Sequence, residues 1–338
     1  MTDSLERSDV AIIGAGPVGL FAVFECGMLD MRCRVFDALD MPGGQCAALY
    51  PEKPIYDIPG HPRIDGGALV DRLVEQAAPF APVYHLGHAV TGLARDAGGF
   101  IVETAAGVRV AARAVIIAAG GGAFGPNRPP LPGIEAFEGS GVFYLARRRE
   151  DFRGRRIVIA GGGDSAIDWA LSLGELAERI FVVHRRAKFR AAPQSIARLQ
   201  QLAADGRVEL VTPYQLAGLE GEAGRLSAVI VADLAGNARR LDADCLLPFF
   251  GLATSLGPLA GWDLALDDSR ITVDPASCAT SRAGIFAIGD IATYPGKLKL
   301  ILSGFAEAAT AAHAIHPLVY PGEALHFEYS TTKGIPGG

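Results

Sequence analysis

The segment Asp9–Ala22, DVAIIGAGPVGLFA, joins an apolar stretch, a glycine-rich turn and the start of a helical pattern. Gly14, Gly16 and Gly19 form a GxGxxG motif directly after the apolar stretch, which predicts a strand. In this motif the first glycine permits a sharp turn, the second lets the backbone approach a pyrophosphate, and the third lets the helix pack against the sheet. A helix beginning near Pro17 offers its free N–H groups to the phosphates. The segment therefore predicts a strand–loop–helix unit that binds a dinucleotide.

Three later features indicate that this dinucleotide is FAD. The next apolar stretch, RCRVFD, ends at Asp37, 23 positions after Gly14, where an acid accepts hydrogen bonds from ribose hydroxyls. The following loop contains Gly44, a second place for close backbone approach, with Gln45 and Tyr50 as groups that could meet a flavin or belong to an ordinary loop. Far downstream, a predicted strand ends at Asp290 and a helical pattern follows, which suits the ribityl and pyrophosphate part of FAD.

The glycine-rich pattern occurs again in GRRIVIAGGGDSAIDWA, residues 154–170, as GxGxxA. Counting 23 positions from Gly161 leads to His184, so the ribose-binding acid is absent, and basic residues follow instead. Guanidinium groups bind a 2′-phosphate through charge-assisted bonds, which predicts NADPH at this second site. A solvated basic turn is the alternative. The residues expected to bind NADPH are Gly161, Gly163, Asp164, Ser165, Ala166, His184, Arg185, Arg186 and Arg190.

The order of these motifs predicts an α/β fold of two Rossmann-like, three-layer ββα domains, the second inserted into the first. Residues 1–120 and 248–338 would form the discontinuous FAD domain, and residues 121–247 the NADPH domain. The crossings, AAGGGAFGPNRPPLPG and LLPFFGLATSLGP, are rich in glycine and proline and follow apolar stretches.

Composition narrows the class of protein. The 338 residues are 50% hydrophobic, and the 42 glycines follow no period, which fits a globular α/β protein. A net charge of −6 gives no basic field for nucleic acid, and no apolar run is long enough to cross a bilayer. The five cysteines form neither a CxxC nor a metal-ligand cluster, so we expect buried, reduced thiols, no metal and a cytoplasmic location.

Taken in order, GxGxxG, PGGQ, GGGDSA, HRRxxFRA and GD resemble the thioredoxin reductase-like flavoproteins over nearly the whole chain. Thioredoxin reductase carries a CxxC just before the second glycine loop, where this chain reads FYLARRRED. The CxxxxC of other disulfide reductases is also absent, because Pro51 stands at the sixth position counted from Cys46. The segments GGQCAALYPEKPIYDIPG and GDIATYPGKLKLILSGFAEAA and a terminal YSTT resemble the thioredoxin reductase-like ferredoxin–NADP⁺ reductases.

This resemblance implies further site residues. A C-terminal tail, about residues 317–338, would cover the flavin, with Tyr329 stacking on one face of the ring and Tyr50 on the other. Ser330 or Thr331 would donate a hydrogen bond near flavin N5, without a dedicated acid–base residue. The resemblance also implies a homodimer. The FAD contacts carried over from the family are Asp37, Gln45, Tyr50, Val90, Phe124, Asp290 and Thr331.

The expected reaction is hydride transfer from NADPH to FAD, followed by transfer of single electrons to ferredoxin or flavodoxin. Two alternatives stay open: an NADPH-dependent diaphorase that reduces quinones or free flavins, and a flavin-bearing redox sensor that is not an enzyme. The arginine-rich stretch 147–156 could dock an acidic ferredoxin, with Lys297 and Lys299 as further candidates, or be a solvated surface.

Overall fold

The computed structural model describes residues 5–144, 146, 148–325 and 330–336. The chain forms two compact units, one built from residues 1–124 and 254–338 and the other from residues 125–253. The first is called the outer unit and the second the inserted unit. None of the helices in the described ranges is both long and apolar enough to cross a membrane.

The outer unit is built on a sheet whose strands lie in the order β5-β2-β1-β8-β7-β6. Strands β5, β2, β1 and β8 are parallel, while β7 and β6 continue as an antiparallel meander. The amino-terminal half of β8 pairs with β7 and its carboxyl-terminal half with β20. The strands of this sheet are β1 (Glu6–Ile13), β2 (Cys33–Asp37), β5 (Val83–Leu86), β6 (Val90–Asp96), β7 (Gly99–Thr104), β8 (Arg109–Ile117) and β20 (Ile285–Ala287).

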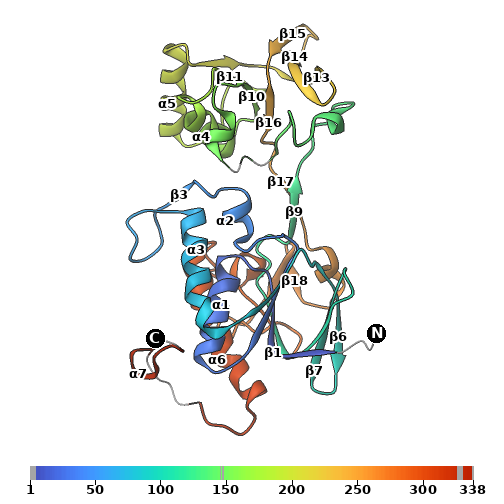
Figure 1. Ribbon diagram of the computed structural model, residues 1–338, viewed down its shortest axis with the longest axis vertical. Helices are drawn as coiled ribbons and strands as arrows, with labels where there is room; N and C mark the ends of the chain where they lie inside the picture. Colours follow the sequence, from blue (N-terminus) through green and yellow to red (C-terminus); the bar gives the residue numbers. More distant parts are fainter. Residues whose placement is uncertain (1–4, 145, 147, 326–329, 337–338) are drawn as a thin grey trace. The chain divides into compact units, whose positions relative to one another are not determined.

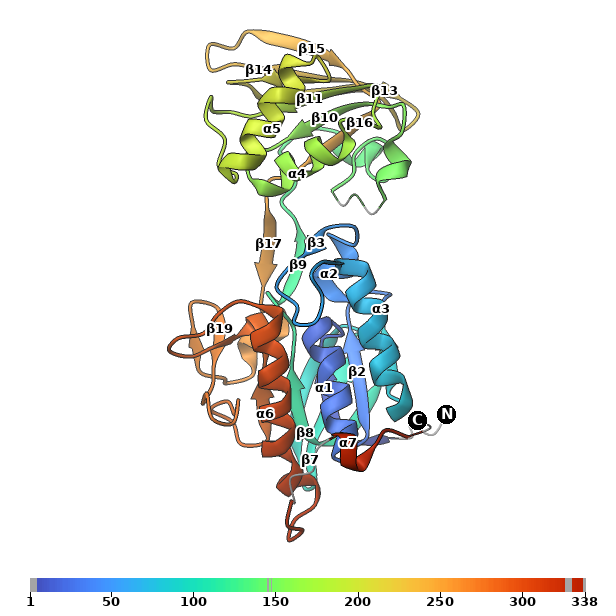
Figure 2. The same cartoon turned by 90° about the vertical axis from the view of Figure 1, so that its left-hand side faces the viewer.

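Helices α1, α3 and α6 cover one face of the parallel strands (Figures 1 and 2). Side chains of the meander strand β7 pack in the core on the opposite face. Strand β1 alternates between the two cores: Val10 and Ile12 pack on the helical side, and Ala11 and Ile13 on the other. This two-residue period of a strand buried on both faces explains the continuous apolar stretch in the sequence. The helices of this unit are α1 (Pro17–Met28), α2 (Gly44–Ala48), α3 (Gly66–Ala77), α6 (Ile301–Val319) and α7 (Ser330–Lys333).

Shorter elements complete the outer unit. They are β3 (Pro54–Ile55), β4 (Ile64–Asp65), β18 (Leu266–Asp267), β19 (Arg270–Thr272), β21 (Ala292–Thr293), and the 3₁₀ helices η1 (Ala78–Phe80), η4 (Gly257–Gly261) and η5 (Gly289–Ile291). Of these, η4 and η5 matter most for the site, because they follow the second crossing and strand β20.

The inserted unit repeats the same plan. Its parallel sheet has the order β12-β11-β10-β16, with α4 and α5 packed on one face and the antiparallel sheet β13-β14-β15 on the other. Two Rossmann-like three-layer units, expected from the sequence, are therefore confirmed. The elements are β10 (Arg156–Ala160), β11 (Arg179–Val183), β12 (Val208–Val211), β13 (Gln215–Glu222), β14 (Arg225–Ala232), β15 (Ala238–Asp242), β16 (Cys245–Pro248), α4 (Asp164–Leu173), α5 (Pro193–Ala204), η2 (Ile134–Phe137) and η3 (Arg149–Phe152).

The two crossings between the units contain short strands, β9 (Ala123–Pro126) and β17 (Leu252–Ser255), which pair with each other. Along the chain, the boundaries between the units fall at 124/125 and 253/254, whereas the sequence patterns place them at 120/121 and 247/248. The difference arises because the chain continues as paired strands past the glycine-rich turns, and no local sequence signal reveals that pairing.

Candidate functional site

The first glycine loop lies between the end of β1 and the start of α1, which has Pro17 in its first turn. Gly14 has φ +110°, and a Cβ there would lie 2.3 Å from the carbonyl oxygen of Ala118. A Cβ on Gly19 would lie 2.0 Å from the carbonyl oxygen of Gly14. A Cβ on Gly16 would meet no atom within 4 Å, and Gly16 lines a cavity. Backbone packing therefore requires two of the glycines, while the third leaves room for a ligand.

This contrast gives a paired prediction. Gly16→Ala should leave the melting temperature of the apoprotein unchanged, because its φ of −70° suits alanine. The added methyl group should weaken FAD binding by about tenfold, as overpacking does elsewhere. Gly19→Ala should instead lower the melting temperature. Calorimetry of both apoproteins and FAD titration measure the two effects. If Gly16→Ala bound FAD like the wild type, this loop would not hold the pyrophosphate.

Asp37 lies at the carboxyl end of β2, beside the same loop. Its carboxylate accepts the N–H of Ala15 at 2.7 Å and the N–H of Leu39 at 2.9 Å. Burial raises the pKa of Asp37, and these backbone hydrogen bonds oppose the rise. A carboxylate has about four acceptor positions, so these backbone hydrogen bonds leave capacity for the ribose hydroxyls of a dinucleotide.

A cavity of about 380 Å³ opens beside this loop in the outer unit. The loop, the acid at the end of β2 and the amino-terminal ends of α1 and α6 all border it, and neither helix has an acidic residue in its first turn. Free N–H groups and uncompensated helix dipoles suit a pyrophosphate. The residues present therefore fit FAD. Eight of the FAD residues expected from the sequence line the cavity: Gly14, Gly16, Pro17, Asp37, Gly44, Gln45, Val90 and Asp290.

Several lining residues carried no recognisable sequence signal. Leu256, Pro258 and Leu259 come from the chain around η4, and Lys299, Leu300 and Ile301 come from the start of α6. They are brought to the cavity by tertiary packing and not by a local motif. Only the helical pattern predicted after Asp290 indicated that the start of α6 lies near the site.

Tyr50 borders a second cavity of about 470 Å³ on the outer unit, together with Lys53 and Tyr56. Lys53 Nζ lies 5.4 Å from the centre of the Tyr50 ring. Cys46 lines both cavities, so the two share a wall at α2. The structure thus places Tyr50 beside the main cavity and not among the residues that line it.

Four further residues were expected at the flavin: Tyr329, Phe124, Ser330 and Thr331. Tyr329 lies outside the described residues, and the side chains of Phe124 and Ser330 do as well. Thr331 lies in α7 and is exposed, and it is not among the residues that line the cavity. The flavin-covering tail remains a prediction.

All five cysteines are free, and four are buried; Cys46 is half-buried. Burial raises the pKa of Cys46 to about 11 and that of Cys278 to about 12. These groups are thiols at neutral pH and therefore poor nucleophiles. Within the described ranges, no group of three or more His, Cys, Asp or Glu residues could hold a metal ion.

The second glycine loop lies between β10 and α4 of the inserted unit. Like Gly16, Gly163 would have no atom within 4 Å of an added Cβ. The basic turn after β11 folds back onto this loop: the N–H of Arg190 donates to the carbonyl of Gly162 at 2.7 Å. The carboxylate of Asp164 accepts the N–H of Ala192 at 3.0 Å, which holds the turn at its other end. Ser165 and Ala166 follow in the first turn of α4.

His184 and the arginines of this turn differ in exposure. His184 is 7% exposed, stacks with Phe189 and packs against Gly162, where a Cβ would lie 2.3 Å from the ring. Burial and the charge of Arg190 lower the pKa of His184, so its ring is neutral at physiological pH. Arg185, Arg186 and Arg190 are exposed and supply the positive charge. The buried ring of His184 thus packs against the glycine loop at Gly162 and supports it.

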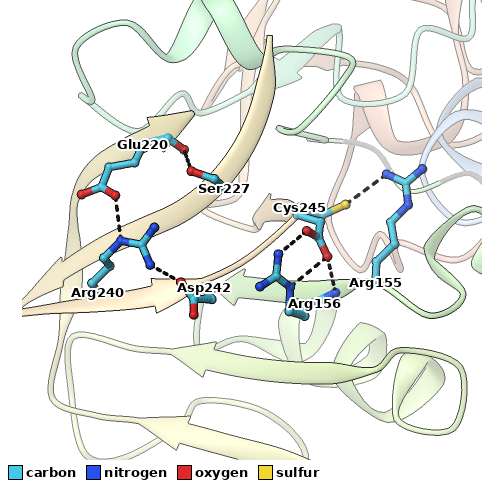
Figure 3. A network of polar contacts seen from close by, with 8 residues as sticks. Arg155, Arg156, Glu220, Ser227, Arg240, Asp242 and Cys245 are labelled. Atoms are coloured by element: carbon cyan, nitrogen blue, oxygen red, sulfur yellow. Dashed lines mark hydrogen bonds and ion pairs between the residues drawn. The ribbon is translucent and has the colours of Figure 1, made fainter. Parts of the chain in front are cut away.

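Much of the arginine-rich stretch is already paired within the inserted unit. Arg153 forms an ion pair with Glu150, and Arg156 binds Asp244 at 2.6 Å through its guanidinium. Arg155 donates to Cys245 Sγ at 3.3 Å, and in Figure 3 the contacts of Arg156 lie between this pair and the ion pairs of Arg240 with Glu220 and Asp242. Arg147 lies outside the described residues. Fewer arginines of this stretch are therefore available to bind an acidic partner protein than the sequence suggests.

Comparisons with known proteins cover nearly the whole chain. The family model described as pyridine nucleotide-disulphide oxidoreductase matches residues 8–314. A protein of Paramagnetospirillum magneticum named ferredoxin–NADP reductase is 66% identical over 98% of this chain and 99% of its own. Proteins of the same name from Rhodospirillum rubrum and Rickettsia akari are 62% and 55% identical, over 98% and 97% of this chain and 97% and 98% of their own.

Solved structures show the same fold at lower identity. Thioredoxin reductase of Lactococcus lactis aligns with a TM-score of 0.74 at 24% identity, over 93% of this chain and 99% of its own. Thioredoxin reductase of T. acidophilum aligns with a TM-score of 0.75 at 23% identity, over 92% and 98%. These two likenesses show the two-unit α/β fold.

Proposed function

Because the chain belongs to the pyridine nucleotide-disulphide oxidoreductase family, we propose that it transfers electrons between NADPH and ferredoxin through bound FAD. The observation that carries this proposal is the pair of glycine loops with opposite ribose chemistry. Asp37 follows the first loop as an acceptor of hydroxyl groups, whereas Arg185 and Arg186 follow the second as donors to a phosphate.

The chain's own residues position both nucleotides. Asp37 would hold the adenosine ribose of FAD, and the amino-terminal ends of α1 and α6 would face its pyrophosphate. Gly163 leaves room for the pyrophosphate of NADPH, and the exposed arginines of the 184–190 turn would bind its 2′-phosphate. FAD supplies the change from two-electron to one-electron chemistry when it is bound.

Two observations support the choice of electron acceptor: the absence of a CxxC motif from the sequence and the names of the relatives. A thioredoxin reductase passes electrons to its own dithiol, and no CxxC occurs anywhere in this sequence. The electrons must therefore go to an external acceptor. The relatives at 55–66% identity carry the name ferredoxin–NADP reductase, which supports ferredoxin as that acceptor, with flavodoxin as the closest substitute.

The finer parts of the proposal depend on single observations. Arg148 and Arg149 are exposed and could face an acidic partner. Lys297 does not serve this purpose, because its side chain is only 3% exposed. Five free cysteines suit a reducing compartment, the cytoplasm. The homodimer, and the stacking of Tyr50 and Tyr329 on the flavin, depend on the family resemblance alone.

One assay separates this function from its closest alternative. The FAD-loaded protein is given NADPH and cytochrome c, with and without a bacterial ferredoxin or flavodoxin. We expect reduction of cytochrome c to depend on the small redox protein, to saturate with it, and to weaken at high salt. Equal rates without it, together with direct reduction of quinones or free flavins, would make the chain a diaphorase instead. A protein that binds no FAD would contradict both functions.

A further inference from the structure

A buried ion pair lies directly behind the wall of the FAD cavity. Glu307, in the second turn of α6, pairs with Lys297, and their side chains are 6% and 3% exposed. The same carboxylate oxygen accepts the hydroxyl of Tyr294 at 2.7 Å. Lys297 Nζ also lies 5.5 Å from the centre of the Tyr294 ring. Both partners are thus removed from water and from any docking partner.

The other oxygen of Glu307 reaches the cavity wall. It accepts the N–H of Gly289 at 2.7 Å, and Gly289 directly precedes Asp290, which lines the cavity. Gly289 has φ +75°. Because glycine adopts positive and negative φ about equally well, this turn needs support from a neighbouring group to keep a single conformation. The carboxylate supplies that support from inside the core.

The ion pair fixes a second part of the same wall. Tyr294 and Lys297 belong to the loop that leads to Lys299, Leu300 and Ile301, which line the cavity where α6 begins. One side chain on α6 therefore connects two segments of the cavity wall, the Gly289–Asp290 turn and the start of α6.

Stability alone does not explain a pair of this kind. Replacing both partners of a buried ion pair with apolar residues of similar volume is often neutral or stabilising, whereas removing one partner leaves an uncompensated charge. Burial and the hydrogen bond to Glu307 raise the pKa of Tyr294 to about 12, so the tyrosine stays a donor across the physiological range. The cluster thus holds one arrangement of the wall at neutral pH.

We propose that Glu307, paired with Lys297, is a positioning residue that sets the affinity for FAD by holding the Gly289–Asp290 turn and the start of α6 in register. This role depends on the proposed FAD site. Glu307 itself touches no ligand and acts only through these two segments.

Three variants test this role. Glu307→Gln keeps the size of the side chain but removes the charge that Lys297 needs. The double variant Lys297→Met/Glu307→Leu removes both charges, and with them the acceptor for Gly289. Asp244→Asn is the matched control in the inserted unit, where Asp244 likewise binds an arginine and accepts a backbone N–H, that of Arg156 at 2.9 Å.

Each folded apoprotein is titrated with FAD by flavin fluorescence, and its melting temperature is recorded. Binding of 2′,5′-ADP reports on the inserted unit. We expect Glu307→Gln to raise the Kd for FAD by about tenfold or more, the loss of roughly one charge-assisted hydrogen bond. The double variant should melt near the wild type and still show the raised Kd. Neither should change the Kd for 2′,5′-ADP, and Asp244→Asn should leave the Kd for FAD unchanged.

The outcomes separate the role of Glu307 from the proposed function. If wild-type apoprotein binds FAD and both Glu307 variants bind it equally well, the positioning role is wrong while the FAD site stands. If the double variant regains both its melting temperature and wild-type FAD affinity, the pair has only a structural role, which also overturns the proposal. If wild-type apoprotein binds no FAD, the proposed function itself fails. Should the double variant not fold, Glu307→Gln alone decides.

Discussion

Asp37→Ala should leave the purified protein largely without flavin. In the proposed site the carboxylate would accept hydrogen bonds from two ribose hydroxyls of FAD, and hydrogen bonds to a charged group contribute about 1.5–3 kcal/mol each. Losing two of them weakens binding by roughly 10²–10⁴-fold. The variant also loses the hydrogen bond that the Ala15 N–H donates to the Asp37 carboxylate, which fixes the glycine loop. We therefore expect no yellow colour after purification.

The measurement is the flavin-to-protein absorbance ratio, followed by FAD titration of the apoprotein. Asp40→Ala is the matched control, because Asp40 is exposed three residues later and does not line the cavity. It should retain FAD fully. Asp37→Asn, which keeps one acceptor oxygen, should lie between the two. Full flavin occupancy in Asp37→Ala would mean that the ribose lies elsewhere.

Arg185→Ala/Arg186→Ala should remove the preference for NADPH over NADH. In the proposed site each guanidinium would form charge-assisted bonds to the 2′-phosphate, and such bonds contribute about 1.5–3 kcal/mol. The double substitution should lower kcat/KM for NADPH by roughly 10²–10⁴-fold. NADH has no 2′-phosphate, so its kcat/KM should stay within about threefold of the wild type. Because both side chains are exposed, the melting temperature should change little.

Steady-state kinetics with ferricyanide, which needs no protein partner, measure both coenzymes in the same variant. Arg207→Ala is the control for the loss of positive charge. Arg207 is exposed just before the edge strand β12, at the amino-terminal end of the parallel strands, whereas the glycine loop follows the carboxyl end of the internal strand β10. It should leave both coenzymes unaffected. An equal loss for NADPH and NADH would show that the arginines support the loop and do not read the phosphate.

The glycine loops and the acid at Asp37 were predictable because their signals are local. A strand, its turn and the following helix occupy consecutive residues, and the structure has them as β1 and α1, and as β10 and α4. Even there, the domain boundaries expected at 120/121 and 247/248 lie four to six residues before those of the structure, at 124/125 and 253/254. Local patterns locate elements better than they locate their ends.

The part of the cavity wall formed by η4 and the start of α6 could not be predicted, because it is assembled from segments far from the glycine loop in the sequence. Leu259 and Leu300 look like ordinary apolar residues in the sequence and reach the cavity only through the packing of η4 and α6. Glu307 looks like any acid on a helix. Lys297 looked like a surface charge for docking, and the structure places it in the core. Such roles depend on tertiary contacts that no spacing reveals.

The different surroundings of Asp37 and of Arg185 and Arg186 also have an evolutionary consequence. The arginines stand on an exposed turn, so sequences can drift there with little effect on folding. The donor coenzyme can therefore be exchanged within a lineage by a few tolerated steps. Asp37 accepts the N–H of Ala15 in the glycine loop and the N–H of Leu39 after β2, so its loss would harm both FAD binding and the scaffold. Selection would thus preserve the flavin while coenzyme choice diverges.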